Sequence, residues 1–187
     1  MKPAPQRSHD VRVIGGQWKR SKLPVLNRPG LRPSPDRVRE TLFNWLGGDL
    51  TGWRCVDAFA GSGALGFEAA SRGAQEVLLL ERDPALVANL RAQKERFGAT
   101  AIRVEADDAR VWLRAGRKDG WDLILLDPPF DADWALAALA DASMLLVPGG
   151  LLYYEAAQTP VEWPAGLSLH RSARAGAVHF HLLQRDV

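Results

Sequence analysis

The stretch from Cys55 to Arg72 constrains the fold of this chain more than any other. An apolar run leads into Gly61, Gly63 and Gly66, and a helical pattern follows over residues 63–72. Glycines in the spacing GxGxxG between a strand and a helix place a nucleotide-type ligand at the helix N-terminus, where free backbone N–H groups lie. The spacing alone is weak evidence, but its position after an expected strand predicts a Rossmann-like α/β fold.

Two acidic residues indicate which ligand this turn holds. Asp57 lies four residues before the first glycine, where its charge would repel a pyrophosphate but attract a cation such as the methionine ammonium of S-adenosylmethionine. Glu81 ends the next apolar run, where a carboxylate can accept hydrogen bonds from ribose hydroxyls. The alternative is a structural turn with a solvated Glu81. The expected cofactor contacts are Asp57, Phe59, Ala60, Gly61, Ser62, Gly63, Glu81, Arg82, Asp107, Asp108 and Ala109.

Asp107 and Asp108 follow the third expected strand at the same sheet edge. We expect Asp108 to accept a hydrogen bond from the adenine amino group, with the Ala109 N–H available to a ring nitrogen. Asp107 is then the candidate cap of the following helix.

Beyond residue 50, short apolar runs alternate with helical patterns, which predicts βαβ units and a parallel sheet. The last two strands are joined by Ala175-Gly176 with no helix between them, so they are antiparallel. This mostly parallel, seven-stranded sheet ending in an antiparallel hairpin suits a class I S-adenosylmethionine-dependent methyltransferase. Strands are expected at 53–59, 76–81, 100–105, 121–126, 149–155, 167–171 and 177–185, and helices near 63–72, 84–97, 108–115 and 132–145.

The chemistry is expected at Asp127-Pro-Pro-Phe130, which follows strand 121–126 at the edge that also carries Asp57. The Asp127 carboxylate and the Pro128 carbonyl are acceptors, Pro129 stiffens the loop, and Phe130 offers a stacking face. An exocyclic amine on a flat base is a poor nucleophile because its lone pair is delocalised. Two acceptors that hold its N–H bonds would aim the lone pair at a methyl group. The alternative is a plain turn at a strand end.

The N-terminal segment is strongly basic. Residues 1–39 carry ten Lys/Arg against two Asp, a net +8, while the other 148 residues carry 14 basic and 20 acidic groups, a net −6. Such a segment indicates a polyanion-binding surface, and a merely solvated face is the alternative. Trp18 suits base stacking and packing of the hairpin equally well. The expected RNA contacts are Arg12, Gly15, Gly16, Trp18, Lys19, Arg20, Lys22, Arg32, Arg37 and Arg39.

Within this segment, residues 11–14 and 22–25 resemble a short hairpin, with Gly15-Gly16 allowing close approach to a partner. A helix follows, with Ser34 as its N-cap and Pro35 as its first residue. It runs to about Leu46. Its core stripe comprises Val38, Leu42, Phe43 and Trp45 or Leu46, and Arg37 and Arg39 fall outside this stripe.

These patterns divide the chain into a flexible lead-in over 1–10, a basic extension over 11–50 and a methyltransferase domain over 51–187. The single cysteine, Cys55, excludes an internal disulfide and favours a small buried hydrophobe. No apolar run approaches bilayer-spanning length, so we expect a cytoplasmic protein without a membrane partner. The four histidines lack metal-ligand spacing with carboxylates, so no metal is expected.

Four blocks of residues together resemble the bacterial 16S rRNA guanine-N2 methyltransferases of the RsmD type. The first two separate these enzymes from other class I methyltransferases, and the likeness extends from about residue 11 onward. One departure is Asp108, where the family often has Asn. The blocks are Arg12-Val-Ile-Gly-Gly-Gln-Trp18, residues 31–45, residues 57–66 and Asp127-Pro-Pro-Phe130.

The resemblance implies S-adenosylmethionine as the methyl donor and the N2 amine of one guanine in 16S rRNA as the acceptor. It also implies a largely assembled small ribosomal subunit as the substrate. Asp57, Gly61, Gly63, Glu81 and Asp108 correspond to cofactor contacts, and Asp127 to Phe130 to the base-binding loop. Two alternatives stay open: a DNA adenine-N6 or protein glutamine methyltransferase with a related loop, and a non-catalytic RNA-binding module on the same fold.

Overall fold

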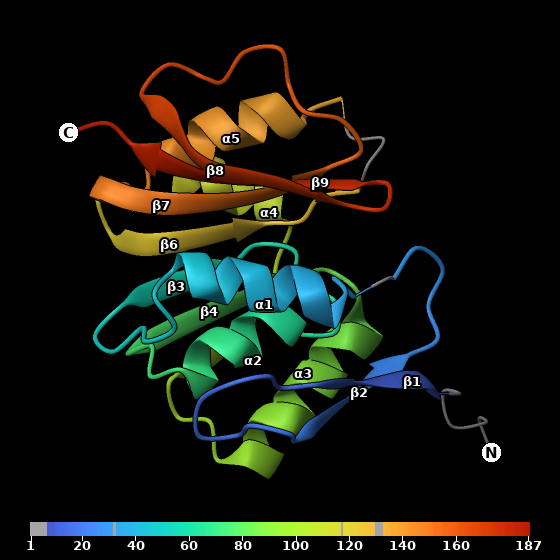
Figure 1. Ribbon diagram of the computed structural model, residues 1–187. Coiled ribbons are helices and arrows are strands. Elements are labelled where there is room, and N and C mark those ends of the chain that lie inside the picture. Colours follow the sequence, from blue (N-terminus) through green and yellow to red (C-terminus); the bar gives the residue numbers. More distant parts are fainter. Residues whose placement is uncertain (1–6, 32, 117, 130–132) are drawn as a thin grey trace.

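The computed structural model describes residues 7–31, 33–116, 118–129 and 133–187. The predicted RNA contact Arg32, the predicted base-stacking Phe130 and residues 1–6 of the lead-in lie outside these residues. The described chain forms a sheet covered by helices on both faces, with a two-stranded hairpin beside it (Figure 1). Among the described residues, no helix combines the length and the apolar character that crossing a lipid bilayer requires.

The main sheet has seven strands in the order β5-β4-β3-β6-β7-β9-β8, which confirms the predicted architecture. Strands β3 to β7 pair in parallel, whereas β9 is antiparallel to both β7 and β8. The strands are β3 Arg54–Asp57, β4 Glu76–Glu81, β5 Ile102–Ala106, β6 Trp121–Leu126, β7 Leu146–Ala156, β8 Leu167–Ala175 and β9 Val178–Arg185.

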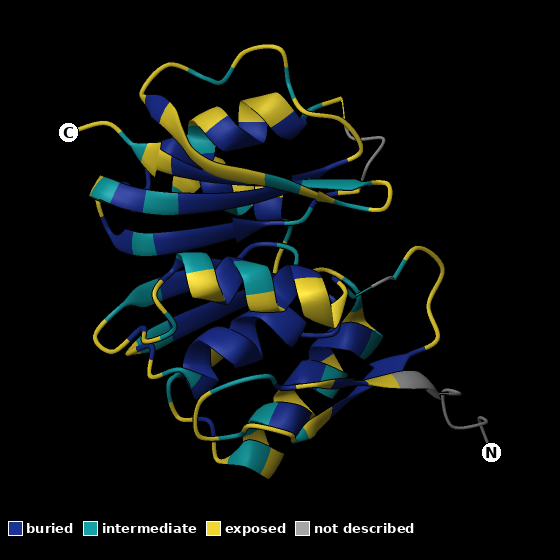
Figure 2. Cartoon of the chain, viewed as in Figure 1, coloured by how far each residue is buried: buried dark blue, intermediate teal, exposed yellow. Residues whose placement is uncertain are grey.

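The central strands β3, β4, β6 and β7 are largely buried because helices cover both faces (Figure 2). Alternate residues of one strand point to opposite faces, so Cys55 packs with one core cluster and Val56 with the other. The first cluster includes residues of α1, α2 and α3, and the second includes residues of α4 and α5. The helices are α1 Asp36–Trp45, α2 Ala64–Ser71, α3 Pro84–Phe97, α4 Ala109–Ala115 and α5 Ala135–Ser143.

Helix α1 confirms the predicted core stripe but not the predicted cap. Val38, Leu42 and Phe43 are fully buried. The N-cap position is Pro35, and no side chain caps the helix. Ser34 instead donates its hydroxyl hydrogen bond to Glu155, a buried carboxylate 121 residues later in the chain. A pattern of neighbouring residues cannot reveal this acceptor, because Glu155 is distant in the sequence and takes the Ser34 hydroxyl away from the helix cap.

The N-terminal hairpin is present, and it starts earlier than predicted. Its antiparallel strands are β1 Arg7–Arg12 and β2 Lys22–Leu26. Residues 7–10, assigned to the flexible lead-in, therefore belong to a strand, because backbone pairing with β2 continues beyond the apolar run. Trp18 lies 5.1 Å from Phe97 and 6.3 Å from Phe67, measured between ring centroids. Of the two interpretations of Trp18, the structure supports packing of the hairpin against the domain.

Candidate functional site

The two motif segments predicted to meet do line one pocket. Asp57 ends β3, Asp127 follows β6 directly, and these two strands pair in parallel. The pocket opens to solvent. Its lining comes from the loop before α1, the glycine turn and the end of β6: Leu31, Pro33, Ser34, Asp57, Phe59, Ala60, Gly61, Ser62, Ala64, Leu65 and Asp127.

The glycine turn needs its three glycines for two reasons, backbone conformation at Gly61 and Gly63 and close packing at Gly66. Gly61 and Gly63 have φ values of +52° and +82°, in the left-handed region that side chains disfavour. A Cβ on Gly66 would lie 2.1 Å from a methyl carbon of Leu79, so α2 could not pack on β4. The Gly66 N–H also donates to the Asp57 carboxylate, with N and O 3.0 Å apart. The motif thus brings the start of α2 against Asp57.

Glu81 joins the end of β4 to the glycine turn. Its Oε2 atom accepts a 2.9 Å hydrogen bond from the Gly61 N–H, and its Oε1 atom accepts bonds from the N–H groups of Arg82 and Asp83. Oε2 keeps a second acceptor position. The carboxylate predicted to bind ribose hydroxyls is therefore held in place by three backbone donors and retains capacity for one more.

Asp108, and not the predicted Asp107, caps the start of α4. Because α4 begins at Ala109, the capping position falls on Asp108, which accepts a 2.9 Å hydrogen bond from the Arg110 N–H. The Arg110 side chain also hydrogen-bonds Asp108 and lowers the pKa of that carboxyl to about 2. Asp107, predicted to be the cap, accepts a bond from the Asp108 N–H instead.

Three carboxylates gather at the carboxyl ends of β3, β6 and β7: Asp57, Asp127 and Glu155, which we call the acidic cluster. Asp57 and Glu155 are buried and Asp127 is half-buried. Glu155 accepts hydrogen bonds from the hydroxyls of Ser34 and Tyr153. The sequence analysis missed Glu155, although it stands near the end of a parallel strand, as Asp57 and Asp127 do.

The acidic cluster is poorly neutralised by the chain itself. Burial is the main cause that raises the pKa of Asp57 to about 7, and Glu81 and Glu155 raise it further against hydrogen bonds from Gly66 and Phe59. The pKa of Asp127 is raised well above its usual range by burial and by its two acidic neighbours. Within the described segments, no Lys or Arg forms an ion pair with any of the three. Such a cluster suits a ligand with a cationic group.

Arg39 does not belong to the RNA-facing surface where it was predicted. Its side chain is fully buried, and its guanidinium lies 3.5 Å from the equally buried Glu68. It also donates to the carbonyl oxygens of Ser34 and Arg12 and to the Asp36 carboxylate. The helical stripe placed Arg39 outside the core because apolar periodicity cannot reveal a buried ion pair.

Glu68 also holds the N-terminal hairpin against α2. It accepts 2.7 Å hydrogen bonds from the N–H groups of Ile14 and Gly15, and its carboxylate lies 2.8 Å from Nε of Arg72. A Cβ on Gly16 would lie 1.8 Å from the backbone oxygen of Ser71. The partner that Gly15-Gly16 approaches closely is therefore α2 of the same chain.

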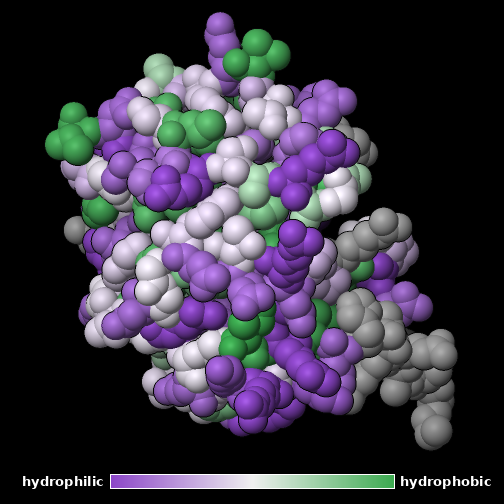
Figure 3. Space-filling view, viewed as in Figure 1, coloured by the Kyte–Doolittle hydropathy of each residue, from purple (hydrophilic) through white to green (hydrophobic). Residues whose placement is uncertain are grey.

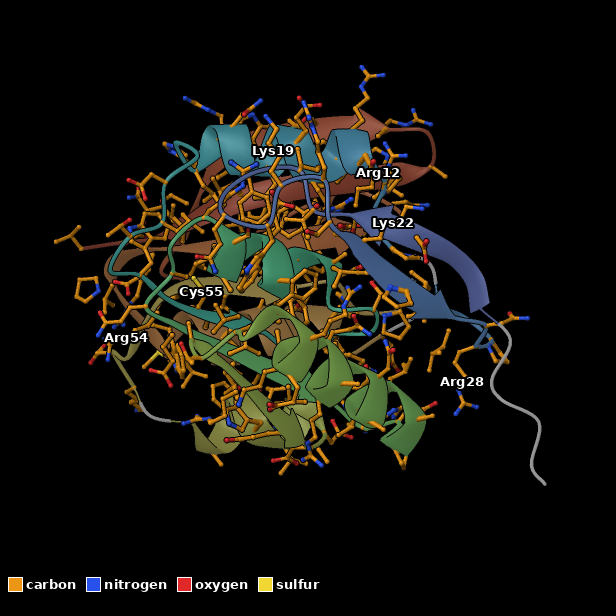
Figure 4. All side chains as sticks on the ribbon, turned by 90° about the horizontal axis from the view of Figure 1, so that it is seen from below. Arg12, Lys19, Lys22, Arg28, Arg54 and Cys55 are labelled. Atoms are coloured by element: carbon orange, nitrogen blue, oxygen red, sulfur yellow. The ribbon has the colours of Figure 1, made fainter. Side chains whose placement is uncertain are left out.

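The other predicted basic residues that the structure describes are exposed. Arg12 and Lys22 are register partners in the hairpin, and Lys19 lies in the loop between its strands (Figure 4). Arg20 and Arg37 are exposed as well. Lys22 forms a 3.5 Å ion pair with Asp10, but both side chains are exposed, so the pair contributes little. Hydrophilic residues cover much of the face that carries α1 and the hairpin (Figure 3).

Comparisons with known proteins give the following matches. Residues 11–184 match the family described as conserved hypothetical protein 95. The chain is 42% identical to the ribosomal RNA small subunit methyltransferase D of Escherichia coli K12, over 99% of this chain and 95% of that protein. It is 37% identical to the protein of the same name from Haemophilus influenzae, over 96% of each.

Solved structures agree with these matches. A proposed methyltransferase from Escherichia coli superposes with a TM-score of 0.84 at 37% identity, over 95% of this chain and 99% of that one. A proposed S-adenosylmethionine-dependent methyltransferase from Streptococcus mutans gives 0.74 at 16% identity, over 98% of this chain and 56% of that one. The fold is that of S-adenosylmethionine-dependent methyltransferases.

Proposed function

Because the chain belongs to the RsmD-type family of ribosomal RNA methyltransferases, we propose that it methylates ribosomal RNA with S-adenosylmethionine as the donor. The acceptor is the exocyclic N2 amine of a guanine in 16S rRNA, within an assembled or partly assembled small subunit. One observation carries the proposal: Asp57 and Asp127 line a single pocket. A donor held at the first residue is therefore beside an amine held at the second.

The pocket, together with residues at the ends of β4 and β5, fits this cofactor in charge and in its hydrogen-bonding groups. Asp57 is a buried carboxylate without an ion-pair partner among the described residues, so a ligand ammonium would supply the missing countercharge. The free acceptor position of Glu81 suits a ribose hydroxyl. At the end of β5, Asp108 remains the proposed acceptor for the adenine amino group, and the Ala109 N–H the donor to a ring nitrogen. When bound, the cofactor supplies an electrophilic methyl group.

Asp127 and Pro128 would hold the amine. Their carboxylate and carbonyl oxygens are acceptors, so two N–H bonds of the guanine amine can be fixed while the lone pair points towards the methyl group of the cofactor. Asp127 also stabilises the positive charge that develops on the nitrogen. Its raised pKa makes it a better proton acceptor than an ordinary carboxylate, so it can take the proton that the methylated amine releases.

The exposed cations of the N-terminal extension would bind the RNA backbone. Arg12, Lys19, Arg20, Lys22 and Arg37 keep their charges at the surface, where each can neutralise a phosphate. Arg28, which was not predicted, is exposed too, and it lies 3.4 Å from Asp83. Val13, Leu23 and Val25 of the same hairpin are buried in the core. Deleting the segment would therefore also remove core packing, so point substitutions test this surface better.

The Asp127→Ala substitution tests the proposal. Transfer of labelled methyl groups to small subunits or 16S rRNA should fall at least about hundredfold, while calorimetry shows nearly unchanged affinity for S-adenosylmethionine. Asp133→Ala, which removes an exposed carboxylate nearby, is the matched control and should retain full activity.

Nucleoside mass spectrometry of the product tests the acceptor atom, because only N2 methylation yields N2-methylguanosine. Side-by-side assays with DNA and with protein release factors test the alternatives that share the Asp-Pro-Pro-Phe type of loop. Full transfer by Asp127→Ala would remove Asp127 from the mechanism, and preferential transfer to DNA or protein would replace the proposed substrate.

A further inference from the structure

The segment that forms β8 and β9 differs in charge from the rest of the methyltransferase domain. Residues 163–185 contain three arginines and three histidines but no Asp or Glu. Residues 40–187 carry a net −6, and this segment contributes +3 to that value with neutral histidines, so the remainder carries −9. A positive segment in an otherwise acidic domain needs a reason beyond solubility.

Strand pairing places the turn of this hairpin at the edge of the sheet that carries the pocket. Because β9 runs antiparallel to β7, Phe180 is paired with Glu155 and His179 with Ala156. The β8–β9 turn therefore lies beyond the end of β7, where Glu155 belongs to the acidic cluster. In Figure 1 the turn projects from the same side of the molecule as the loop between β2 and α1, which reaches the pocket through Leu31.

Both arginines of β8 are exposed. Arg174 lies one residue before the end of the strand and Arg171 at its middle, and because they are three positions apart they lie on opposite faces of the strand. β8 is the outermost strand of the sheet and is exposed along much of its length (Figure 2). Arg174 donates a 2.8 Å hydrogen bond to the carbonyl of Gly176, and Arg171 donates to the carbonyl of His170. Neither arginine forms an ion pair with a carboxylate in the part of the chain that the structure describes.

Arg185, at the far end of the same hairpin, behaves differently. It is half-buried, and its guanidinium pairs with Asp119 and donates to the carbonyl of Leu146, the first residue of β7. The chain thus neutralises the arginine at the opposite end of the sheet, whereas the two nearer the pocket have no carboxylate partner among the described residues. This contrast favours a ligand over a structural role for Arg171 and Arg174.

We propose that the outer edge of the β8–β9 hairpin is a second phosphate-binding surface for the substrate RNA, with Arg171 and Arg174, on the two faces of the edge strand β8, as its contacts. The inference rests on the proposed function, since it takes RNA as the substrate. The acidic cluster repels the phosphates next to a target nucleotide, so cations on both sides of the pocket are needed to hold the backbone there. The N-terminal extension supplies these cations on the side of α2 and α3, and β8 supplies cations on the other side, beyond β7.

The double variant Arg171→Ala/Arg174→Ala tests this surface by binding to 16S rRNA at several salt concentrations. Loss of two phosphate contacts should weaken binding about tenfold near 0.15 M salt and reduce the slope of log affinity against log salt by about 1.4 to 1.8. Cofactor affinity, thermal stability and kcat at saturating RNA should stay unchanged, and Arg171→Lys/Arg174→Lys should restore most of the binding.

The control is Arg114→Glu on α4, which removes the same two units of net charge. Arg114 is 69% exposed, and its Nε atom lies 3.5 Å from a carboxylate oxygen of Asp141. RNA affinity within about twofold of the parent chain is expected for it. An unchanged affinity and salt slope in the alanine double variant, with the parent chain active on RNA, would overturn this inference alone. A parent chain that transfers no methyl group to RNA would overturn the proposed function first, and this surface with it.

Discussion

Two buried acidic centres in this molecule have opposite electrostatic arrangements. Glu68, on α2, is fully buried between Arg39 and Arg72 and accepts hydrogen bonds from two backbone N–H groups. The acidic cluster at the ends of β3, β6 and β7 has three carboxylates, hydroxyl and backbone donors, and no ion-paired cation among the described residues.

The difference distinguishes a structural carboxylate from one reserved for a ligand. A buried charge is stable only with a partner. Around Glu68 the chain supplies that partner, so the N-terminal extension is fixed to the domain. In the acidic cluster the partner has to come from a ligand. Without that ligand the ionised form of Asp57 is unfavourable, which is why its pKa is raised.

The largest effect is expected when Glu68 loses one of the cations that neutralise it. Arg39→Met should lower the free energy of unfolding by about 3 kcal/mol, because Glu68 loses one of its buried partners. Urea unfolding measures this change. Arg37→Met, two residues earlier on the exposed side of α1, should alter stability by less than about 0.5 kcal/mol but weaken RNA binding. Equal stability of the two variants would show that Glu68 does not depend on Arg39.

A smaller effect is expected where a carboxylate of the acidic cluster is replaced. Asp57→Asn should weaken S-adenosylmethionine binding about hundredfold, because the ligand cation loses its partner. The folded-state pKa of about 7 exceeds the unfolded value near 4, so ionisation of Asp57 destabilises the fold increasingly across that range and fully above it.

The ligand-free Asp57→Asn protein should therefore melt at a higher temperature than its parent at pH 8, with a smaller difference at pH 5. Calorimetry gives the affinity and scanning fluorimetry gives the melting temperatures. A lower melting temperature at pH 8 would mean that Asp57 stabilises the ligand-free fold, against the contrast drawn above.

The smallest effect is the pH dependence of cofactor binding. A cation binds the ionised form of Asp57, so affinity should fall by up to about tenfold for each pH unit below 7 and level off above it. Titrations at pH 6, 7 and 8 measure this. Asp57→Asn should show a weaker dependence, with what remains due to Asp127 and Glu155, whose pKa values are also raised. A flat profile in the parent chain would show that Asp57 is already ionised before the ligand binds.

Much of the fold followed from local patterns. The order of strands and helices, the glycine turn and the antiparallel end of the sheet were all predicted, since apolar periodicity and turn residues act over a few neighbours. The errors at Ser34 and Arg39 concern polar side chains whose partners are distant in sequence. Ser34 bonds Glu155, 121 residues away, and Arg39 pairs with Glu68, which no local pattern can reveal.

The sequence by itself determined the class of fold and the two segments that carry the proposed chemistry, because parallel strands bring their carboxyl ends to one edge whatever the details of packing. Only the tertiary structure decided which charges are used internally and which remain for ligands. It buried Arg39 against Glu68, turned Gly15-Gly16 against α2, added Glu155 to the acidic cluster and left Arg171 and Arg174 exposed. The reason is physical: the state of a charge depends on burial and on neighbours in space, and neither is a property of a residue's place in the chain.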